Sequence, residues 1–153
     1  WYYGDCYIAY GMTETPSSIP GAPHEISIYN HIDYNTDCVR LARFAVRLDG
    51  FFSWHADYTP GHVVTHPIVF EGNMLSINFA TSALGYVQIR LLDVDGNLIE
   101  GYDSGKLFGD SVDRIVDFKN SLGELARKKI RMEIAMSDAE FYSFKFFEIP
   151  EVL

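Results

Sequence analysis

The sequence predicts an all-β protein: an antiparallel β-sandwich of the jelly-roll type with an N-terminal strand-and-loop extension. Three observations lead to this fold class. Apolar and polar residues alternate with a period of two along most of the chain, as in strands with one buried face. Turn-forming residues separate these runs by about 10–14 residues, a spacing typical of antiparallel sandwiches. The one helical candidate, SLGELARK (121–128), is about one helical turn long before the strand pattern resumes.

The extension is expected to occupy residues 1–48, as a strand and a Pro-rich linker. A loop rich in proline, serine and glycine, TETPSSIPGAPHE (13–25), interrupts its strand-like runs. In the last of these runs the alternation of apolar residues with arginines slips near Ala42, which predicts a β-bulge. The runs with strand character are WYYGDCYIAYGM (1–12), ISIYNHIDYN (26–35) and VRLARFAVRLDG (39–50).

The sandwich itself is expected to occupy residues 49–153, and the Asp49-Gly50 turn leads into its first strand. Most of its strand-like runs are bounded by turn signals: TPG, EGN, SALG, VDGN, SLGE and SDAE. The runs are FFSWHAD (51–57), HVVTHPIVFE (62–71), MLSINFAT (74–81), YVQIRLLDVDG (86–96), DRIVDF (113–118), KKIRMEIAM (128–136) and FYSFKFFEI (141–149).

Composition and charge argue against two classes of binding partner, nucleic acids and membranes. The net charge of −9 repels phosphate backbones and anionic lipids, so we expect neither a nucleic acid nor a membrane as partner. No apolar run approaches the roughly 18–20 residues of a spanning helix, and no signal peptide is recognised. The chain starts at Trp1, so it is expected to be a processed product or an excised fragment. Cys6 and Cys38 form either one disulfide or two free thiols.

Several stretches occur in a familiar order: RLDGFFSW (47–54), HVVTHPIVFEGNMLSINFATSALGYVQIRLLDVDGNLIEGY (62–102), LFGDSVDRIVDF (107–118) and KKIRMEIAMSDAEFYSFKF (128–146). Together they resemble the C-terminal β-sandwich domain of bacterial glycoside-hydrolase-like proteins. In that group a five-bladed β-propeller related to the family 32 and 43 glycosidases precedes the sandwich. The resemblance covers about residues 40–147, and residues 11–29 are similar to the segment that leads out of such a propeller.

The resemblance implies a concanavalin-like or jelly-roll module attached to a sugar-processing protein. The parent protein would then be a glycoside hydrolase, with a secreted or cell-surface location. Catalytic carboxylates in this group belong to the propeller, and residues 1–48 are too short to form one, so the resemblance assigns no catalytic residue. The chain departs from the family pattern at Trp54-His55, where smaller or non-aromatic residues are usual.

The segment FFSWHADY (51–58) is the main candidate for ligand binding. In a regular strand Phe52, Trp54, Ala56 and Tyr58 share one face, and His55 and Asp57 lie on the other. The favoured structural interpretation places the aromatic face in the core. If it is exposed instead, Trp54, Tyr58 or the more distant Tyr102 offers a ring for sugar stacking, and His55 and Asp57 offer hydrogen bonds.

Two groups of residues invite a metal interpretation. His62 and His66 would lie about 13 Å apart in a strand, too far to share one zinc ion, which makes exposed strand histidines the better account. Asp93, Asp95 and Asn97 match the start of a calcium-binding loop, but Gly96 is out of place and no Glu follows at the twelfth position. A hairpin turn is favoured there, and a structural calcium ion formed by loop oxygens stays open as an alternative.

The candidates for catalysis are the acidic residues Asp103, Asp110, Asp113 and Asp117, the last three within FGDSVDRIVDF (108–118). Glycoside hydrolysis needs two carboxylates, one of which holds its proton near neutral pH. Arg114 next to Asp113 disfavours a protonated carboxyl, so an ion-paired loop is the preferred interpretation.

Three hypotheses remain. The favoured one is a non-catalytic accessory module of a carbohydrate-active protein, binding glycan or packing on a glycosidase domain of the same protein. The second is a purely structural interdomain module, and the third is a jelly-roll glycoside hydrolase or lyase. Exposure of the aromatic residues separates the first from the second.

Overall fold

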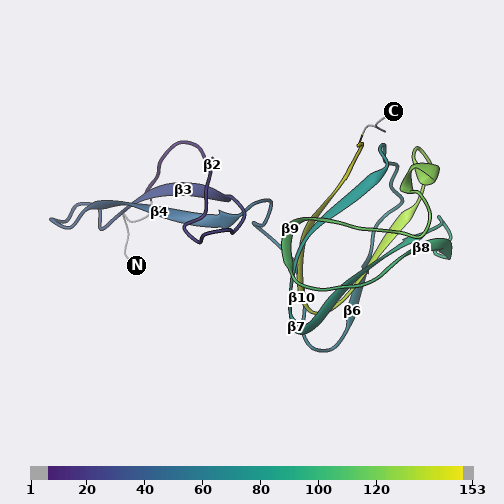
Figure 1. Ribbon diagram of the computed structural model, residues 1–153. Helices are drawn as coiled ribbons and strands as arrows, with labels where there is room; N and C mark the ends of the chain where they lie inside the picture. Colours follow the sequence, from purple (N-terminus) through teal and green to yellow (C-terminus); the bar gives the residue numbers. More distant parts are fainter. Residues whose placement is uncertain (1–6, 150–153) are drawn as a thin grey trace. The chain divides into compact units, whose positions relative to one another are not determined.

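The computed structural model describes residues 7–149. The chain divides into two compact units, with the boundary between Phe51 and Phe52. Nearly all regular structure in the described part is β-strand, and its one helical segment is the short 3-10 helix η1 (Leu122–Leu125). All the strand pairs are antiparallel (Figure 1). The predicted all-β class is therefore confirmed.

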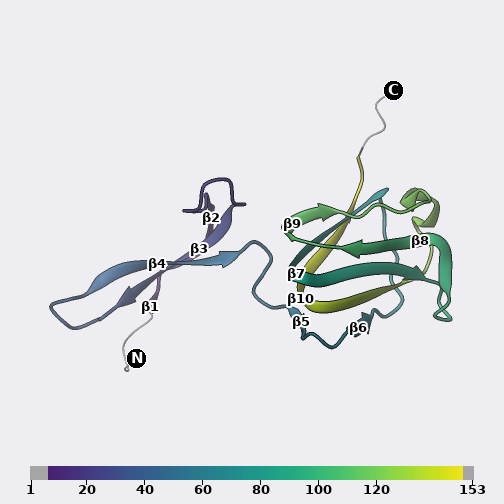
Figure 2. The same ribbon diagram turned by 60° about the horizontal axis from the view of Figure 1, so that its bottom comes forward.

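The first unit is a small sheet centred on β3 (Glu25–Ile32). One edge of β3 pairs along its whole length with β4 (Arg40–Arg47), and the other edge pairs with the short strands β1 (Tyr7–Ile8) and β2 (Thr13–Thr15) (Figure 2). The β3–β4 register runs without a break, so the β-bulge predicted near Ala42 is wrong. The break in the alternation of apolar residues and arginines near Ala42 does not disturb the pairing of β4, because neither face of this strand is fully buried.

Polar contacts, and not an apolar core, tie this first sheet together. Of its described residues only Ser27 is buried. The guanidinium of Arg43 on β4 donates to Ser27 Oγ (2.6 Å) and Glu25 Oε2 (2.8 Å) on β3, and to Thr15 Oγ1 (2.9 Å) on β2. One arginine thus joins three strands. Cys38 in this unit is an exposed free thiol, and Cys6 lies outside the described residues.

The second unit is a six-stranded sheet built on two long strands. β7 (Met74–Leu92) and β10 (Arg131–Phe147) pair with each other over most of their length. On the outer side of β7 lie β8 (Leu98–Leu107) and β9 (Asp110–Ile115), and on the outer side of β10 lie β5 (Trp54–Ala56) and β6 (Gly61–Val64). The sheet therefore has two halves, and each long strand runs through both. One half has β5 and β9 as its edge strands, and the other has β6 and β8 (Figures 1 and 2).

The two halves share one hydrophobic core, which makes the unit a sandwich. Burying a Leu, Ile or Phe side chain contributes about 1.5–3 kcal/mol, so this core dominates the stability of the unit. Phe70 stacks on Phe146 (4.1 Å between ring centroids) at its margin, next to Leu122 and Leu125 of η1. The central buried residues are Leu75, Ile77, Phe79, Val87, Ile89, Leu91, Met132, Ile134, Met136, Ala139 and Phe141.

Two predicted turns are bends inside continuous strands. SALG (82–85) and SDAE (137–140) were expected to reverse the chain, but they lie within β7 and β10. Ser137 pairs with Tyr86 and Ala139 with Thr81, so residues 82–85 oppose Asp138 alone. Ser82 Oγ accepts the N–H groups of Leu84 (3.2 Å) and Gly85 (3.0 Å), a local turn that bends β7 without reversing it. The VDGN turn, in contrast, joins β7 and β8 as predicted.

Candidate ligand-binding site

Trp54 lies on the edge strand β5, opposite Phe141 of β10. The two rings stack with 6.2 Å between centroids and 16° between planes, and Phe141 is fully buried beneath. β5 pairs with β10 and lies at an edge of the sheet. Trp54 keeps 47% of its surface exposed while its ring is held by the core.

A shallow groove of about 140 Å³ runs beside this indole, and we call it the edge groove. Phe52, which is 88% exposed and precedes β5, adds a second aromatic side chain. The favoured expectation that Phe52, Trp54 and Tyr58 belong to the core is therefore wrong; of that predicted face only Ala56 is buried. The residues that line the edge groove are Phe52, Ser53, Trp54, Phe141 and Tyr142.

A hydrogen-bonded cluster lies next to the edge groove, centred on His55. Its Nδ1 is 2.7 Å from Glu140 Oε1 on β10, and its Nε2 is 3.0 Å from Asp57 Oδ1. Ser53 of the groove donates its hydroxyl to the other carboxylate oxygen of Glu140. Sequence analysis found His55 and Asp57 but missed Glu140, because the pairing of β5 with β10 joins residues far apart in the chain.

The two carboxylates raise the pKa of the His55 imidazole above its ordinary value of 6.5. The hydrogen bond to Asp57 is the largest cause, followed by the hydrogen bond and the charge of Glu140. His55 is more than half exposed, so solvent screens these interactions. The cluster nevertheless favours the imidazolium over the neutral ring, because both carboxylates stabilise the charged form.

The other predicted aromatic residues differ in their surroundings. Tyr58 is 74% exposed, and its carbonyl accepts a hydrogen bond from Ser137 Oγ (2.9 Å). Tyr102 is only 2% exposed, and its hydroxyl donates to the Ser121 carbonyl (2.9 Å). Burial raises the pKa of the Tyr102 phenol, with Glu124 adding to the shift. Tyr102 is thus a core residue that ties β8 to the segment before η1, and it is removed from the candidate site.

The predicted calcium loop is a tight turn closed by Asp93. Its carboxylate accepts the backbone N–H groups of Asp95 and Asn97 (2.9 Å each) and the side-chain amide of Asn97 (3.0 Å). The side-chain bond from Asn97, with these backbone bonds, lowers the pKa of Asp93. Within residues 7–149 no cluster of three or more His, Cys, Asp or Glu side chains is arranged to hold a metal ion.

The acidic residues considered for catalysis lie at the opposite edge of the sheet. Asp110 and Asp113 belong to β9, and Asp113 bonds with its strand neighbour Ser111. Asp103 on β8 is partly buried, which opposes ionisation, but bonds from Gln88, the Gly105 N–H and Arg90 still lower its pKa. An acid with a lowered pKa is ionised at neutral pH and is unsuited to donate a proton to a leaving group.

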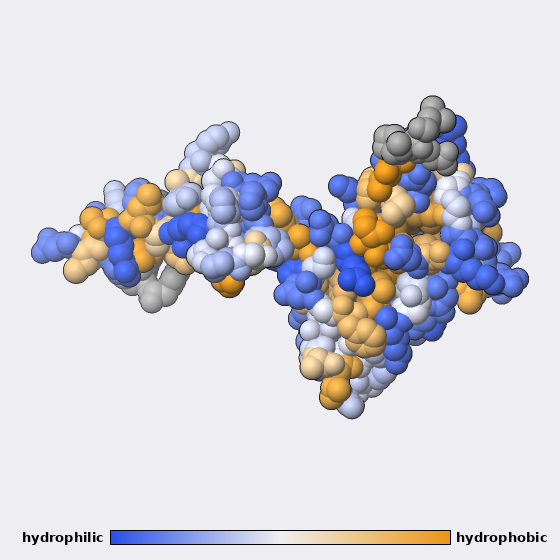
Figure 3. Space-filling view, viewed as in Figure 1, coloured by the Kyte–Doolittle hydropathy of each residue, from blue (hydrophilic) through white to orange (hydrophobic). Residues whose placement is uncertain are grey.

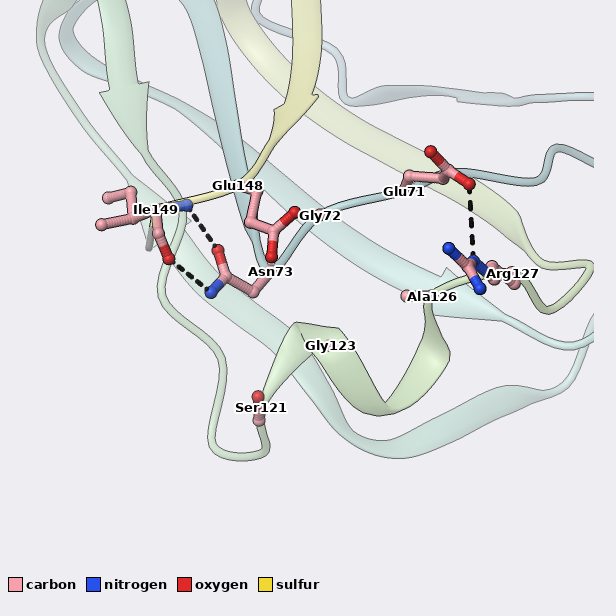
Figure 4. Close-up of a pocket in the computed structure, with 9 residues that line it drawn as sticks. All are labelled: Glu71, Gly72, Asn73, Ser121, Gly123, Ala126, Arg127, Glu148 and Ile149. Atoms are coloured by element: carbon pink, nitrogen blue, oxygen red, sulfur yellow. Dashed lines mark hydrogen bonds and ion pairs between the residues drawn. The ribbon is translucent and has the colours of Figure 1, made fainter. Parts of the chain in front are cut away.

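A second, larger and more polar pocket of about 530 Å³ lies between the start of β7, η1 and the end of β10 (Figure 4). Its Glu71–Arg127 ion pair (3.4 Å) is mostly exposed, and Asn73 exchanges two hydrogen bonds with the Ile149 backbone (2.9 and 3.0 Å). Asn73 therefore holds the chain after β10 and is not available to a ligand. The lining residues are Glu71, Gly72, Asn73, Ser121, Gly123, Ala126, Arg127, Glu148 and Ile149.

The surface of the second unit mixes polar and apolar areas (Figure 3). Among residues 7–149 no helix has both the length and the apolar character that crossing a membrane requires. Searches with protein-family models, curated protein sequences and solved structures found no match for this chain. The geometry of the edge groove is therefore the main basis for a functional assignment.

Proposed function

We propose that this chain is a non-catalytic β-sandwich accessory module of a carbohydrate-active protein, and that it binds glycan at the edge groove. The proposal rests mainly on Trp54, which is about half exposed and stacks on the buried Phe141. Phe52, close to it in the chain, is exposed as well. A sugar ring presents an apolar face of C–H groups, and a rigid indole at the surface matches that face at a small entropic cost.

A sugar site needs hydrogen-bonding groups in addition to a ring, and the groove offers the hydroxyl of Ser53, which precedes β5, together with the Tyr142 phenol. Ser53 lines the groove and leads through Glu140 to His55 and Asp57. Ser53 can exchange hydrogen bonds with a sugar hydroxyl in the groove, whereas His55 and Glu140 lie on the other face of the sheet and hold β5 in place. Both charged partners of His55 are carboxylates, and none of the five residues that line the groove is basic. A neutral glycan therefore suits the groove better than a uronic acid or a sulfated sugar.

The order of motifs in residues 40–147 also supports this proposal, because it resembles the sandwich domain of glycoside-hydrolase-like proteins. The same resemblance supports one alternative, in which the exposed aromatic residues pack on a glycosidase domain of the same protein. Phe52, which is exposed in the second unit, favours that alternative. Glycan binding by the isolated chain separates the two functions.

Affinity gel electrophoresis with a panel of neutral and acidic polysaccharides tests the proposal. We expect retardation of the wild type by at least one neutral polysaccharide. Trp54→Ala should weaken it about tenfold or more, because an aromatic anchor carries a large share of binding energy. Phe52→Ala should also weaken binding, and since Phe52 is exposed and outside any strand, this variant leaves the fold intact.

Phe108→Ala is the matched control. Phe108 is also an exposed aromatic residue, but it lies between β8 and β9 at the other edge of the sheet. Its replacement should leave retardation unchanged. A folded wild type that no polysaccharide retards would favour interdomain packing, and binding that survives both Trp54→Ala and Phe52→Ala would rule out the edge groove as the binding site.

A further inference from the structure

The edge groove depends on a very short strand. β5 has three residues, and its register with β10 consists of the pairs Trp54–Phe141, His55–Glu140 and Ala56–Ala139. Trp54 and His55 are adjacent, so whatever fixes His55 on Glu140 also fixes the indole on Phe141. Edge strands of this length have little backbone pairing to hold them and open readily.

Both ring nitrogens of His55 face carboxylate oxygens, Glu140 at 2.7 Å and Asp57 at 3.0 Å. An ionised carboxylate only accepts hydrogen bonds, and a neutral imidazole has one N–H group to donate. Only the imidazolium can therefore make both bonds at the same time. The arrangement is complete in the protonated state and loses one bond when His55 is deprotonated.

The charged groups around His55 all favour this protonated state. Asp57 faces it from the segment after β5, and Glu140 faces it from β10. A further acidic residue of β10, Asp138, lies close by, since its backbone N–H donates to the Asp57 carbonyl (2.8 Å). No basic side chain makes a charge contribution at His55. Deprotonation would leave Asp57 and Glu140 without a cation between them.

We propose that protonated His55 holds β5 against β10. As the pH rises and His55 loses its proton, the edge groove becomes less ordered and its affinity for glycan decreases. The dependence on glycan rests on the proposed function, whereas the fastening of β5 does not.

The pKa of His55 is raised above 6.5 in the folded chain. The stabilisation that protonated His55 provides is therefore complete below about pH 6.5. It is lost as the pH rises through the pKa that His55 has in the folded chain. Because solvent screens exposed ion pairs, we expect the affinity to change by no more than about fivefold.

Tryptophan fluorescence tests the fastening without any ligand. Trp1 is the only other tryptophan, so a Trp1→Phe background reports on Trp54 alone. Between pH 5 and 9 the emission should change with a single midpoint above 6.5, equal to the pKa of His55 measured by NMR. His55→Gln in the same background should abolish this change. His62→Gln, at an exposed histidine on β6, should leave it intact.

Binding of the neutral polysaccharide selected by the gel is then measured at pH 5.5 and pH 8.5. We expect about two- to fivefold weaker binding at pH 8.5 for the wild type and no difference for His55→Gln. A Trp54 signal that does not follow His55 overturns the inference, whatever the chain binds. A signal that follows His55 without glycan binding at either pH supports the fastening and contradicts the proposed function. Equal affinity at both pH values overturns the coupling.

Discussion

At the scale of single residues, the function open to an aromatic side chain depends on whether the fold leaves it exposed. Trp54 and Tyr102 were both candidates for sugar stacking. Both lie on edge strands, β5 and β8, but Trp54 is 47% exposed, whereas Tyr102 is buried against Phe118 and the segment before η1. Local sequence cannot distinguish the two, because burial depends on which distant segments of the chain pack on each side chain.

Tyr102→Phe should lower the free energy of unfolding by about 1 kcal/mol, since it leaves the Ser121 carbonyl without its donor. Glycan binding should not change, because the ring lies in the core. Urea unfolding and the affinity gel check both expectations. Weakened binding with unchanged stability would show that Tyr102 acts at the surface after all.

His55→Gln should destabilise the chain more at pH 5.5 than at pH 8.5. The reason is the sign of the shift: a histidine with a raised pKa stabilises the folded state while it is protonated, and that contribution disappears at higher pH. Urea unfolding of both proteins across this range measures the difference. A constant difference, or one that grows with pH, would contradict the assignment of His55 as a protonated partner of Asp57 and Glu140.

At the scale of elements, the alternation of residues predicted most of the long strands β7 and β10, but no predicted run covers β8, and the connections were predicted less well. The runs 74–81 and 86–96 have clear apolar faces, and these faces form the core as expected. The SALG and SDAE segments between runs contain the residue types of turns, yet each bends a continuous strand. A bend and a reversal use the same residues, and only the pairing of β7 with β10 on both sides of the bend decides between them.

Gly85→Ala should destabilise the protein by about 1–3 kcal/mol, as overpacking does. A Cβ atom at position 85 would collide with the carbonyl oxygens of Ser137 and Asp138, so the bends in β7 and β10 would have to separate. Gly61→Ala is the matched control, since its Cβ would meet only the Ala56 side chain at 4.0 Å. Thermal unfolding measures both variants, and equal stability of the two would contradict the close approach of the strands.

At the scale of the whole molecule, the two units differ in how they are held together. The second unit has a continuous apolar core, while the first depends on hydrogen bonds around Ser27 and Arg43. The sequence predicted a separate N-terminal segment from its Pro-rich loop, but it did not predict a sheet without a core. The strand patterns of residues 26–35 and 39–50 look like those of the sandwich, and burial is a property of what packs on them.

Native-state hydrogen exchange should therefore separate the two units. Amides in the centre of β7 and β10 should exchange only through global unfolding, and those of β3 and β4 should exchange at least about a hundredfold faster. The experiment uses the full chain at a pH where intrinsic exchange is slow. Equal protection of β3 and β10 would contradict a first unit without a core of its own.

The central claim is that Trp54 is a glycan anchor, and a titration of Trp54 fluorescence in the Trp1→Phe background tests it most directly. At pH 5.5 a neutral oligosaccharide derived from the retarding polysaccharide should produce a saturable change in emission, and an acidic oligosaccharide of equal length should not. Phe52→Ala should weaken the response, and Phe108→Ala should not. Binding of the oligosaccharide, measured by calorimetry, without any change at Trp54 would contradict the claim.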